Sequence, residues 1–247
     1  MRFKLPVFVF LSILSLYLQA QDQVKTDQGT LELHPITHGT LALIWDDKTI
    51  YVDPYGGARG FEGLKAPDII LITDIHGDHL DIPTLEKLET SKAKWIVPEA
   101  VAAKLPKELA ADVTVIANGA KTTALGVEIE AIPMYNLPQS DDAFHTKGRG
   151  NGYVLTMGNK RIYLSGDTED IPEMRTLKKI DIAFVCMNLP YTMDIHQAAS
   201  AVLEFKPKIV YPYHYRGQGG LSDVKKFEQL VNDGDESIEV RLRNWYP

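Results

Sequence analysis

Short apolar runs that end in polar loops are the feature that most restricts how this chain can fold. Three of them occupy residues 69–72, 182–186 and 209–211, and they are rich in Ile, Val and Tyr. Runs of this length and composition are typical of strands that are buried on both faces. Stretches with helical spacing of apolar residues lie between and after these runs, at 82–88, 99–105, 195–205 and 224–231. The pattern predicts a single α/β domain in which helices cover sheets.

Further strands are expected in both halves of the chain. Residues 31–37, 41–45 and 49–52 are interpreted as a meander, preceded by a loose polar lead-in at 21–30. Other strands are expected at 95–97, 113–116 and 127–132, and a hairpin is expected from 153–157 and 161–164 around the turn 158–160. In each half, strands run into a loop that carries a carboxylate. This weakly indicates a duplicated unit.

The first twenty residues have the composition of an export signal. Arg2 and Lys4 precede an apolar run over 5–18, and Ala20 offers a small residue at a cleavage point. The run is too short for a comfortable membrane span. We therefore expect a signal peptide at 1–20, a mature domain at 21–247, and a secreted or periplasmic protein without stable membrane insertion. A buried N-terminal helix or an uncleaved anchor are the alternatives, and the intact mass of the exported protein separates them.

Charge and cysteine content exclude some classes of function. The formal net charge is −7, whereas a nucleic-acid binder needs a basic face, so no nucleic-acid partner is expected. A small-molecule substrate remains, and it can be anionic if local cations hold it. Cys186 is the single cysteine and lies in an apolar run. We interpret it as a buried, inert thiol that cannot form an internal disulfide.

The loop after the first buried run carries the most chemistry. Asp74, His76, Asp78 and His79 follow one another within six residues. In an extended segment, residues two apart point the same way, so the first three can converge, and Gly77 lets the chain bend so that His79 joins them. Imidazole and carboxylate together suit Zn²⁺, Fe²⁺ or Mn²⁺. A loop that only caps the next helix explains one aspartate but not the other three residues.

Further ligands are expected after other strands. Asp167 directly follows the strand at 161–164, and His214 follows the one at 209–211. His145 lies in a polar loop and is the third candidate. The alternatives are a turn-forming role for Asp167, a core position for His214 and simple exposure for His145.

These motifs together resemble the metallo-β-lactamase superfamily of metal-dependent hydrolases, in particular its ascorbate-6-phosphate lactonase-like branch. The pattern Asp74-x-His76-x-Asp78-His79, then Asp167, then His214 matches that family in order and context, and the stretch from Thr37 to Pro54 resembles its opening meander. The resemblance covers nearly all of residues 31–215. It implies a four-layer αββα sandwich and one or two divalent metal ions, with Zn²⁺ the first expectation and Mn²⁺ or Fe²⁺ the alternatives.

The family pattern also assigns ligands, and this chain departs from it twice. Asp74 stands where the family has a histidine, and Asn136 lies where its middle histidine is often found. By resemblance, Asp74 and His76 would bind the first metal with a third ligand, from His145 or the Asn136 region. Asp78, His79 and His214 would bind the second, and Asp167 would bridge. Both departures affect the first position, so a lone second metal is one expectation.

The resemblance implies a hydrolase that uses a metal-activated hydroxide to attack a carbonyl or phosphoryl centre, in a substrate of the lactone or phosphoester class. Asp78 is the expected catalytic group, because it can orient the nucleophile and accept a proton. The alternative is a metal-binding sensor or binding protein of the same fold without turnover. An iron-based redox protein is less favoured, since no second redox centre is visible in the sequence.

Several other residues keep two interpretations. Asp53 either accepts a ligand imidazole N–H or shapes a turn. His38 either supports a metal ligand or, as the sequence favours, is structural. Arg149 either clamps a carboxylate or phosphate of a ligand or, as the sequence slightly favours, is a surface charge. Residues 191–193 are candidates to line a pocket, and His196 is expected to be exposed.

Overall fold

The computed structural model describes residues 22–109 and 112–247. The expected signal peptide at 1–20 lies outside these residues. In the described part of the chain, no helix is long and apolar enough to cross a membrane.

The first half of the chain forms a seven-stranded sheet in the order β1-β2-β3-β4-β5-β6-β7. The first four strands pair antiparallel, and the pairs from β4 to β7 are parallel. The bounds of the strands are β1 Asp22–Thr26, β2 Gly29–Thr37, β3 Thr40–Trp45, β4 Lys48–Val52, β5 Ile69–Leu71, β6 Lys94–Val97 and β7 Val113–Val115.

The second half repeats this plan in a sheet of the order β16-β13-β12-β11-β10-β9-β8. Here β8 to β11 pair antiparallel, and the pairs from β11 through β12 and β13 to β16 are parallel. The bounds are β8 Lys121–Ala124, β9 Val127–Met134, β10 Gly150–Met157, β11 Lys160–Leu164, β12 Ile182–Cys186, β13 Ile209–Tyr213 and β16 Glu239–Val240. Each sheet is therefore an antiparallel meander extended by parallel strands, which agrees with the duplicated unit indicated by the sequence.

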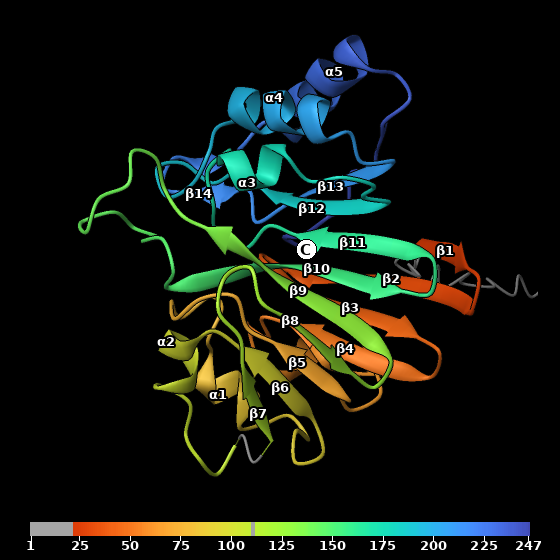
Figure 1. The fold of residues 1–247 in the computed structure, drawn as a ribbon, viewed down its shortest axis with the longest axis vertical. Coiled ribbons are helices and arrows are strands. Elements are labelled where there is room, and N and C mark those ends of the chain that lie inside the picture. Colours follow the sequence, from red (N-terminus) through yellow and green to blue (C-terminus); the bar gives the residue numbers. More distant parts are fainter. Residues whose placement is uncertain (1–21, 110–111) are drawn as a thin grey trace, which may run out of the picture.

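Helices lie on the outer faces of the two sheets, as Figure 1 shows. The helices α1 Ile82–Leu85 and α2 Glu99–Ala102 lie beside β5 to β7, and α3 Pro172–Arg175, α4 Ile195–Phe205 and α5 Val224–Gly234 lie over the second sheet. A 3₁₀ turn, η1 Ala58–Phe61, and a small hairpin, β14 Arg216–Gly217 with β15 Gly220–Leu221, complete the described elements. The expected α/β sandwich with layers in the order αββα is confirmed.

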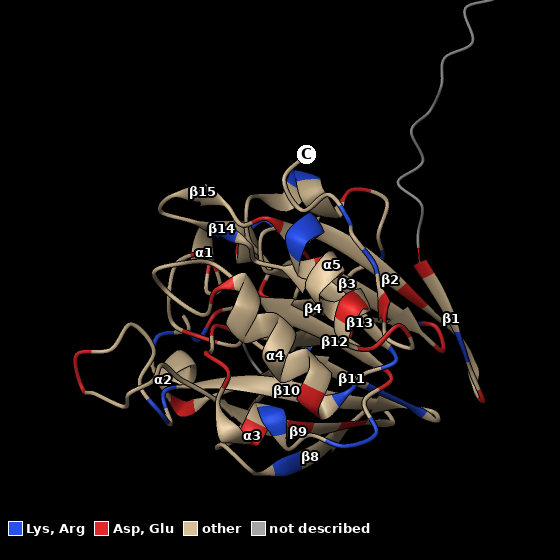
Figure 2. Ribbon diagram, turned by 90° about the horizontal axis from the view of Figure 1, so that it is seen from above, with Lys and Arg blue, Asp and Glu red and all other residues tan. Residues whose placement is uncertain are grey.

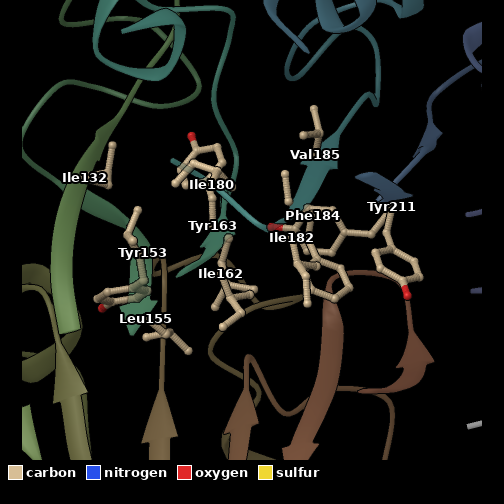
Figure 3. Packing of buried hydrophobic residues seen from close by; sticks show 14 of the residues in the cluster. Ile132, Tyr153, Leu155, Ile162, Tyr163, Ile180, Ile182, Phe184, Val185 and Tyr211 are labelled. Carbon is tan, nitrogen blue, oxygen red and sulfur yellow. The ribbon is translucent and has the colours of Figure 1, made fainter. Parts of the chain in front are cut away.

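Strand β5 shows why the layers form. Ile69 and Leu71 belong to the large apolar cluster between the sheets, whereas Ile70 and Ile72 belong to a smaller cluster under α1 and α2. Alternate side chains point to opposite faces of a strand, so an unbroken apolar run is buried on both sides. Figure 3 shows the large cluster from close by, with Tyr163, Phe184 and Tyr211 of neighbouring strands packed together.

Charged residues lie on strands, helices and loops alike. Figure 2 shows Lys and Arg interspersed with Asp and Glu over the face that carries α4 and α5.

The structure corrects the sequence-based elements in a few places. The lead-in was predicted as a loose segment, but residues 22–26 form β1, which pairs with β2. Strand β8 and the short helix α3 were not predicted. The helices expected at 82–88 and 99–105 are each only four residues long. The helix expected at 195–205 has these bounds in the structure, and a capping box between Asp194 and Gln197 fixes its start.

Candidate metal centre

The predicted ligands meet at one edge of the two sheets. The loop 74–79 follows β5, Asp167 follows β11 and His214 follows β13. His145 lies in the connection between β9 and β10. Since parallel strands end at the same edge of a sheet, their following loops are brought together there. The structure thus gathers all the candidate ligands named from the sequence.

Three residues at this edge have left-handed backbone conformations. His38, Asp53 and His214 have φ angles of 55°, 44° and 46°. Such conformations cost energy in residues other than glycine and are enriched at functional sites. Gly39 is required beside His214, because a Cβ at that position would lie 2.9 Å from the Cδ2 atom of the ring.

His79, Asp167 and His214 form the most enclosed cluster, with all three side chains buried. The Nε2 atom of His79 lies 3.4 Å from Oδ2 of Asp167, and Nε2 of His214 lies 3.5 Å from Oδ1 of the same carboxylate. The rings of His79 and His214 are stacked, with their centroids 5.1 Å apart. One carboxylate between two imidazoles is a donor set that suits a transition metal or Zn²⁺.

The hydrogen bonding of this cluster tests whether a cation fits. The atoms Nε2 of His79, Nε2 of His214 and Oδ1 of Asp167 are buried without a hydrogen-bond partner among the described residues, and so is Nε2 of His145. Buried polar atoms are almost always paired, because leaving them unpaired costs free energy. A cation among these lone pairs would satisfy all of them, so the residues present fit a metal ion.

Charge also favours a cation here. Burial alone would raise the pKa of Asp167, but the neighbouring His214 and His79 lower it well below its usual value. Burial alone would lower the pKa of His79, but Asp167 and Asp53 raise it well above its usual value. The cluster therefore keeps an ionised carboxylate and attracts positive charge, which metal binding would supply in exchange for protons.

Asp53 determines how His79 is oriented. Its Oδ2 atom lies 2.9 Å from Nδ1 of His79, and it also accepts hydrogen bonds from the amide and hydroxyl groups of Thr73 at 2.7 and 2.6 Å. Because the carboxylate accepts the Nδ1 proton, Nε2 is left free to face Asp167. Of the two interpretations of Asp53, the structure supports that of the imidazole acceptor.

Asp78 lies beside the enclosed cluster and lines a cavity. Its Oδ2 atom lies 3.3 Å from Nε2 of His214 and 3.1 Å from Nε2 of His38. Burial alone would raise the pKa of Asp78, but the neighbouring imidazoles of His214 and His38 lower it below its usual value. Asp78 is therefore an ionised carboxylate that is held by two imidazoles at the cavity wall.

His38 is the site residue that the sequence undervalued. It was expected to be structural, yet it contacts Asp78, and its Nδ1 atom lies 2.8 Å from the hydroxyl of Tyr246. The Tyr246 hydroxyl also accepts a hydrogen bond from the amide of Arg216 at 2.9 Å. No local motif reveals these contacts, because His38 and Tyr246 come from opposite ends of the chain.

Asp74, His76 and His145 form a separate cluster. Asp74 is fully buried, and its Oδ2 atom lies 3.0 Å from Nδ1 of His76 and 3.9 Å from Nε2 of His145. His145 also lies 3.2 Å from Oδ2 of Asp167, so it stands between the two clusters. The structure therefore brings His145, and not Asn136, to the first metal position.

Asn136 instead holds the loop that carries His145. Its Oδ1 atom accepts the backbone amide of His145 at 2.7 Å, and its Nδ2 atom donates to the carbonyl of Tyr191 at 2.8 Å. That carbonyl also lies 3.2 Å from Nδ1 of His145, which leaves Nε2 directed at Asp167. His145 was alternatively interpreted as exposed, but it is buried.

Arg149 is not a surface charge, as the sequence slightly favoured. Its Nε atom donates to Oδ1 of Asp74 at 2.9 Å, and its Nη2 atom donates to Oδ2 at 2.7 Å. The structure thus pairs Arg149 with a carboxylate of the protein itself, and the clamping of a ligand carboxylate or phosphate stays a prediction.

A cavity of about 330 Å³ opens beside both clusters. Its lining combines polar side chains with two aromatic rings, and consists of His76, Asp78, Phe144, His145, Asp167, Asn188 and Tyr191. Phe144 and Tyr191 contact each other edge to face, with their ring centroids 5.1 Å apart, and Phe144 is 51% exposed. Of residues 191–193, only Tyr191 lines the cavity, while Thr192 and Met193 are buried behind it. His196 is exposed, as expected.

Comparison with known proteins agrees with this arrangement. A family model described as a β-lactamase superfamily domain matches residues 32–214. The chain belongs to the metallo-β-lactamase superfamily. A UPF0173 metal-dependent hydrolase from Pyrococcus abyssi is 31% identical over 205 residues, which cover 78% of this chain and 89% of the relative. This places the chain in the UPF0173 metal-dependent hydrolase family.

Solved structures show the same fold within the superfamily. A crystal structure described as a metal-dependent hydrolase from Parabacteroides distasonis has a TM-score of 0.77 and 41% identity, over 90% of this chain and 97% of that one. A metallo hydrolase from Ignicoccus hospitalis has a TM-score of 0.73 and 23% identity, over 87% of this chain and 95% of that one. The more specific resemblance to the ascorbate-6-phosphate lactonase-like branch stays a prediction.

Proposed function

We propose that this protein is a metal-dependent hydrolase that cleaves a lactone or another neutral ester. The observation that carries the proposal is the set of buried, unpaired donor atoms of His79, His145, Asp167 and His214 beside an open cavity. A purely structural cluster would satisfy these atoms within the protein. A site that binds a metal and a substrate leaves them free.

The metal and Asp78 would divide the chemistry. His79, Asp167 and His214 would hold a divalent cation, which would lower the pKa of a bound water and polarise the attacked oxygen. Zn²⁺ is our first expectation for this histidine-rich donor set, with Mn²⁺ or Fe²⁺ as alternatives. Asp78, ionised and facing the cavity, orients the attacking water and accepts its proton at Oδ2.

The cavity lining supports a neutral carbonyl substrate. No Lys or Arg is among the described residues that line it, and the charge of nearby Arg149 is neutralised by Asp74. A phosphomonoester carries up to two negative charges and is normally held by cationic side chains. The aromatic wall of Phe144 and Tyr191 instead suits an apolar group on the substrate. A phosphodiester, which has one negative charge, is the second substrate class.

A binding protein or sensor without turnover is the competing function. The observation that favours it is the changed first metal position, where Asp74 is paired with Arg149. It differs from the hydrolase in one measurable way, because metal would bind without catalysis.

Two measurements test the proposal together. Elemental analysis of the purified protein should find at least one Zn²⁺, Mn²⁺ or Fe²⁺ per chain. The metallated protein should then hydrolyse members of a panel of lactones and esters in preference to phosphodiesters, phosphomonoesters and β-lactams. Stoichiometric metal without turnover of any panel member would favour the binding protein, and a protein with no affinity for metal would overturn both functions.

A further inference from the structure

The start of β10 places Arg149 beside the first metal position. The adjacent Gly150 begins β10, and the amide of Asn151 donates to the carbonyl of Thr73 at 2.9 Å, directly before Asp74. Gly150 is required at this approach, because a Cβ there would lie 2.7 Å from the Thr73 carbonyl oxygen. The start of β10 therefore brings the guanidinium next to Asp74.

The guanidinium engages the ligand atoms that the first metal would need. Its two bonds to Asp74 involve both carboxylate oxygens, at 2.9 and 2.7 Å. Its Nη2 atom also lies 3.5 Å from Nε2 of His76 and donates to the carbonyl of Phe144 at 2.7 Å. Two of the three residues in this cluster are thus already paired with an internal cation.

The second metal position has the opposite property. The unpaired buried atoms of the site belong to His79, Asp167 and His214, with His145 between the clusters. In the first cluster Arg149 pairs both oxygens of the buried Asp74, and only His145 contributes such an atom. The two positions therefore differ in how ready they are to accept a cation.

This difference in pairing predicts that the two positions differ in their affinity for a divalent cation. A guanidinium stays charged at every physiological pH, and a bidentate pair with a buried carboxylate is strong and directional. A divalent cation at Asp74 would have to share that carboxylate with a fixed positive charge close by. Repulsion between the two like charges would weaken its binding.

We propose that Arg149 determines the metal content of this protein by acting as a permanent counter-ion for Asp74 and His76, so that the chain binds one divalent cation tightly instead of two. The tight ion lies at His79, Asp167 and His214, beside Asp78. This inference rests on the proposed metal-dependent function. Arg149 acts on the metal site through Asp74 and not through contact with the substrate.

Metal stoichiometry measures this role without relying on activity. The protein is stripped with a chelator, dialysed against buffered Zn²⁺ and analysed for bound metal, and isothermal titration then gives the affinity of each equivalent. The wild-type protein should bind one equivalent tightly. Arg149→Met, which is long and uncharged, should gain a second equivalent, bound at least about tenfold more tightly than any second ion in the wild type.

Two further variants keep the result interpretable. Asp74→His combined with Arg149→Met leaves no buried unpaired charge, so it decides the question if Arg149→Met alone does not fold. It too should bind two equivalents. Arg59→Met removes an exposed arginine and should bind one, like the wild type.

The outcomes separate this inference from the function on which it rests. Two tight equivalents in the wild-type protein would overturn the inference and leave the proposed hydrolase intact. A folded Arg149→Met protein, or a folded double variant, that still binds one equivalent would also overturn it. A wild-type protein that binds no metal would instead overturn the proposed function.

Discussion

The carboxylate of Asp53 accepts the Nδ1 proton of His79 at 2.9 Å, although 26 positions separate the two residues in the chain. Asp53 ends the meander of the first sheet, and His79 ends the loop that follows the next strand. The pair is fully enclosed, since both side chains are about 1% exposed. This contact leaves Nε2 as the nitrogen of His79 that a metal would meet.

Asp53→Asn should lower the affinity for Zn²⁺ by about 10- to 100-fold, the range typical of groups that orient metal-binding histidines. The carboxylate accepts hydrogen bonds from three donors. The amide group of asparagine would place N–H groups against some of these donors, and an N–H group cannot accept a hydrogen bond. Competition with a chromophoric chelator measures the affinity. Asp68→Asn is the matched control, because Asp68 accepts the amide of Thr49 at the opposite end of the same strands. An unchanged affinity in the Asp53 variant would contradict the orienting role.

Asp78→Ala should reduce kcat by about 10²- to 10⁴-fold, the usual contribution of a general base. The protein should remain folded, because Asp78 lies on the cavity wall and not in the apolar core. Steady-state kinetics on the best panel substrate and circular dichroism provide the two readouts. Asp142→Ala removes an exposed carboxylate from the loop that carries His145 and should leave kcat unchanged. A fully active Asp78→Ala enzyme would refute the assignment.

Removal of the metal should lower the thermal stability of the protein. At a free Zn²⁺ concentration of about 100 times Kd, binding to the native state adds about 2.7 kcal/mol to the free energy of unfolding. For a chain of this size this corresponds to a shift in Tm of about 5–10 °C. Calorimetry with Zn²⁺ and with excess chelator measures it. Identical melting curves would show that the unpaired atoms of His79, Asp167 and His214 do not bind the ion.

Phe144→Ala should raise KM for lactones with an apolar substituent by about tenfold while kcat changes little. The ring lines the cavity and is not a candidate metal ligand, and loss of about 1–2 kcal/mol of apolar contact is expected. Binding that is equal in the ground and transition states affects KM alone. A substrate without the apolar group serves as the control. A loss of kcat with an unchanged KM would place Phe144 in the chemistry instead.

Cys186 should resist alkylation in the native protein. The thiol is buried, and burial raises its pKa to about 11. At pH 8 it stays protonated and covered, so iodoacetamide should label it only after denaturation in urea, as mass spectrometry would show. Because the unfolded thiol ionises near its usual pKa of about 8.5, this residue also favours unfolding as the pH rises above that value. Rapid labelling of the folded protein would contradict its buried position.

The sequence predicted the parts of the fold that depend on local apolar pattern. The runs 69–72 and 182–186 were identified because a strand buried on both faces has almost no polar residue. Strand β1 was missed since its alternating exposed side chains are Gln23 and Lys25, and such a polar edge strand looks like a loop. Strand β8 was missed for the same reason, because Lys121 and Thr123 are its exposed residues.

The candidate site was predictable where its residues follow a strand within a few positions. Asp74, His76, Asp78 and His79 share one loop, and Asp167 and His214 each follow an apolar run. His38 and Arg149 were misjudged, because their partners Asp78 and Asp74 lie 40 and 75 positions away. Pairing of strands within the first sheet brings His38 to Asp78, and packing of the two sheets brings Arg149 to Asp74; no local spacing records either contact.

The two repeated sheets also have a consequence for the mechanics of the chain. His79 comes from the first sheet, and Asp167 and His214 come from the second. An ion bound by all three would tie the halves of the molecule to each other, as a disulfide does in many exported proteins. With a single cysteine, this chain cannot form an internal disulfide. The metal would then add a cross-link between the two halves to the apolar core that they already share.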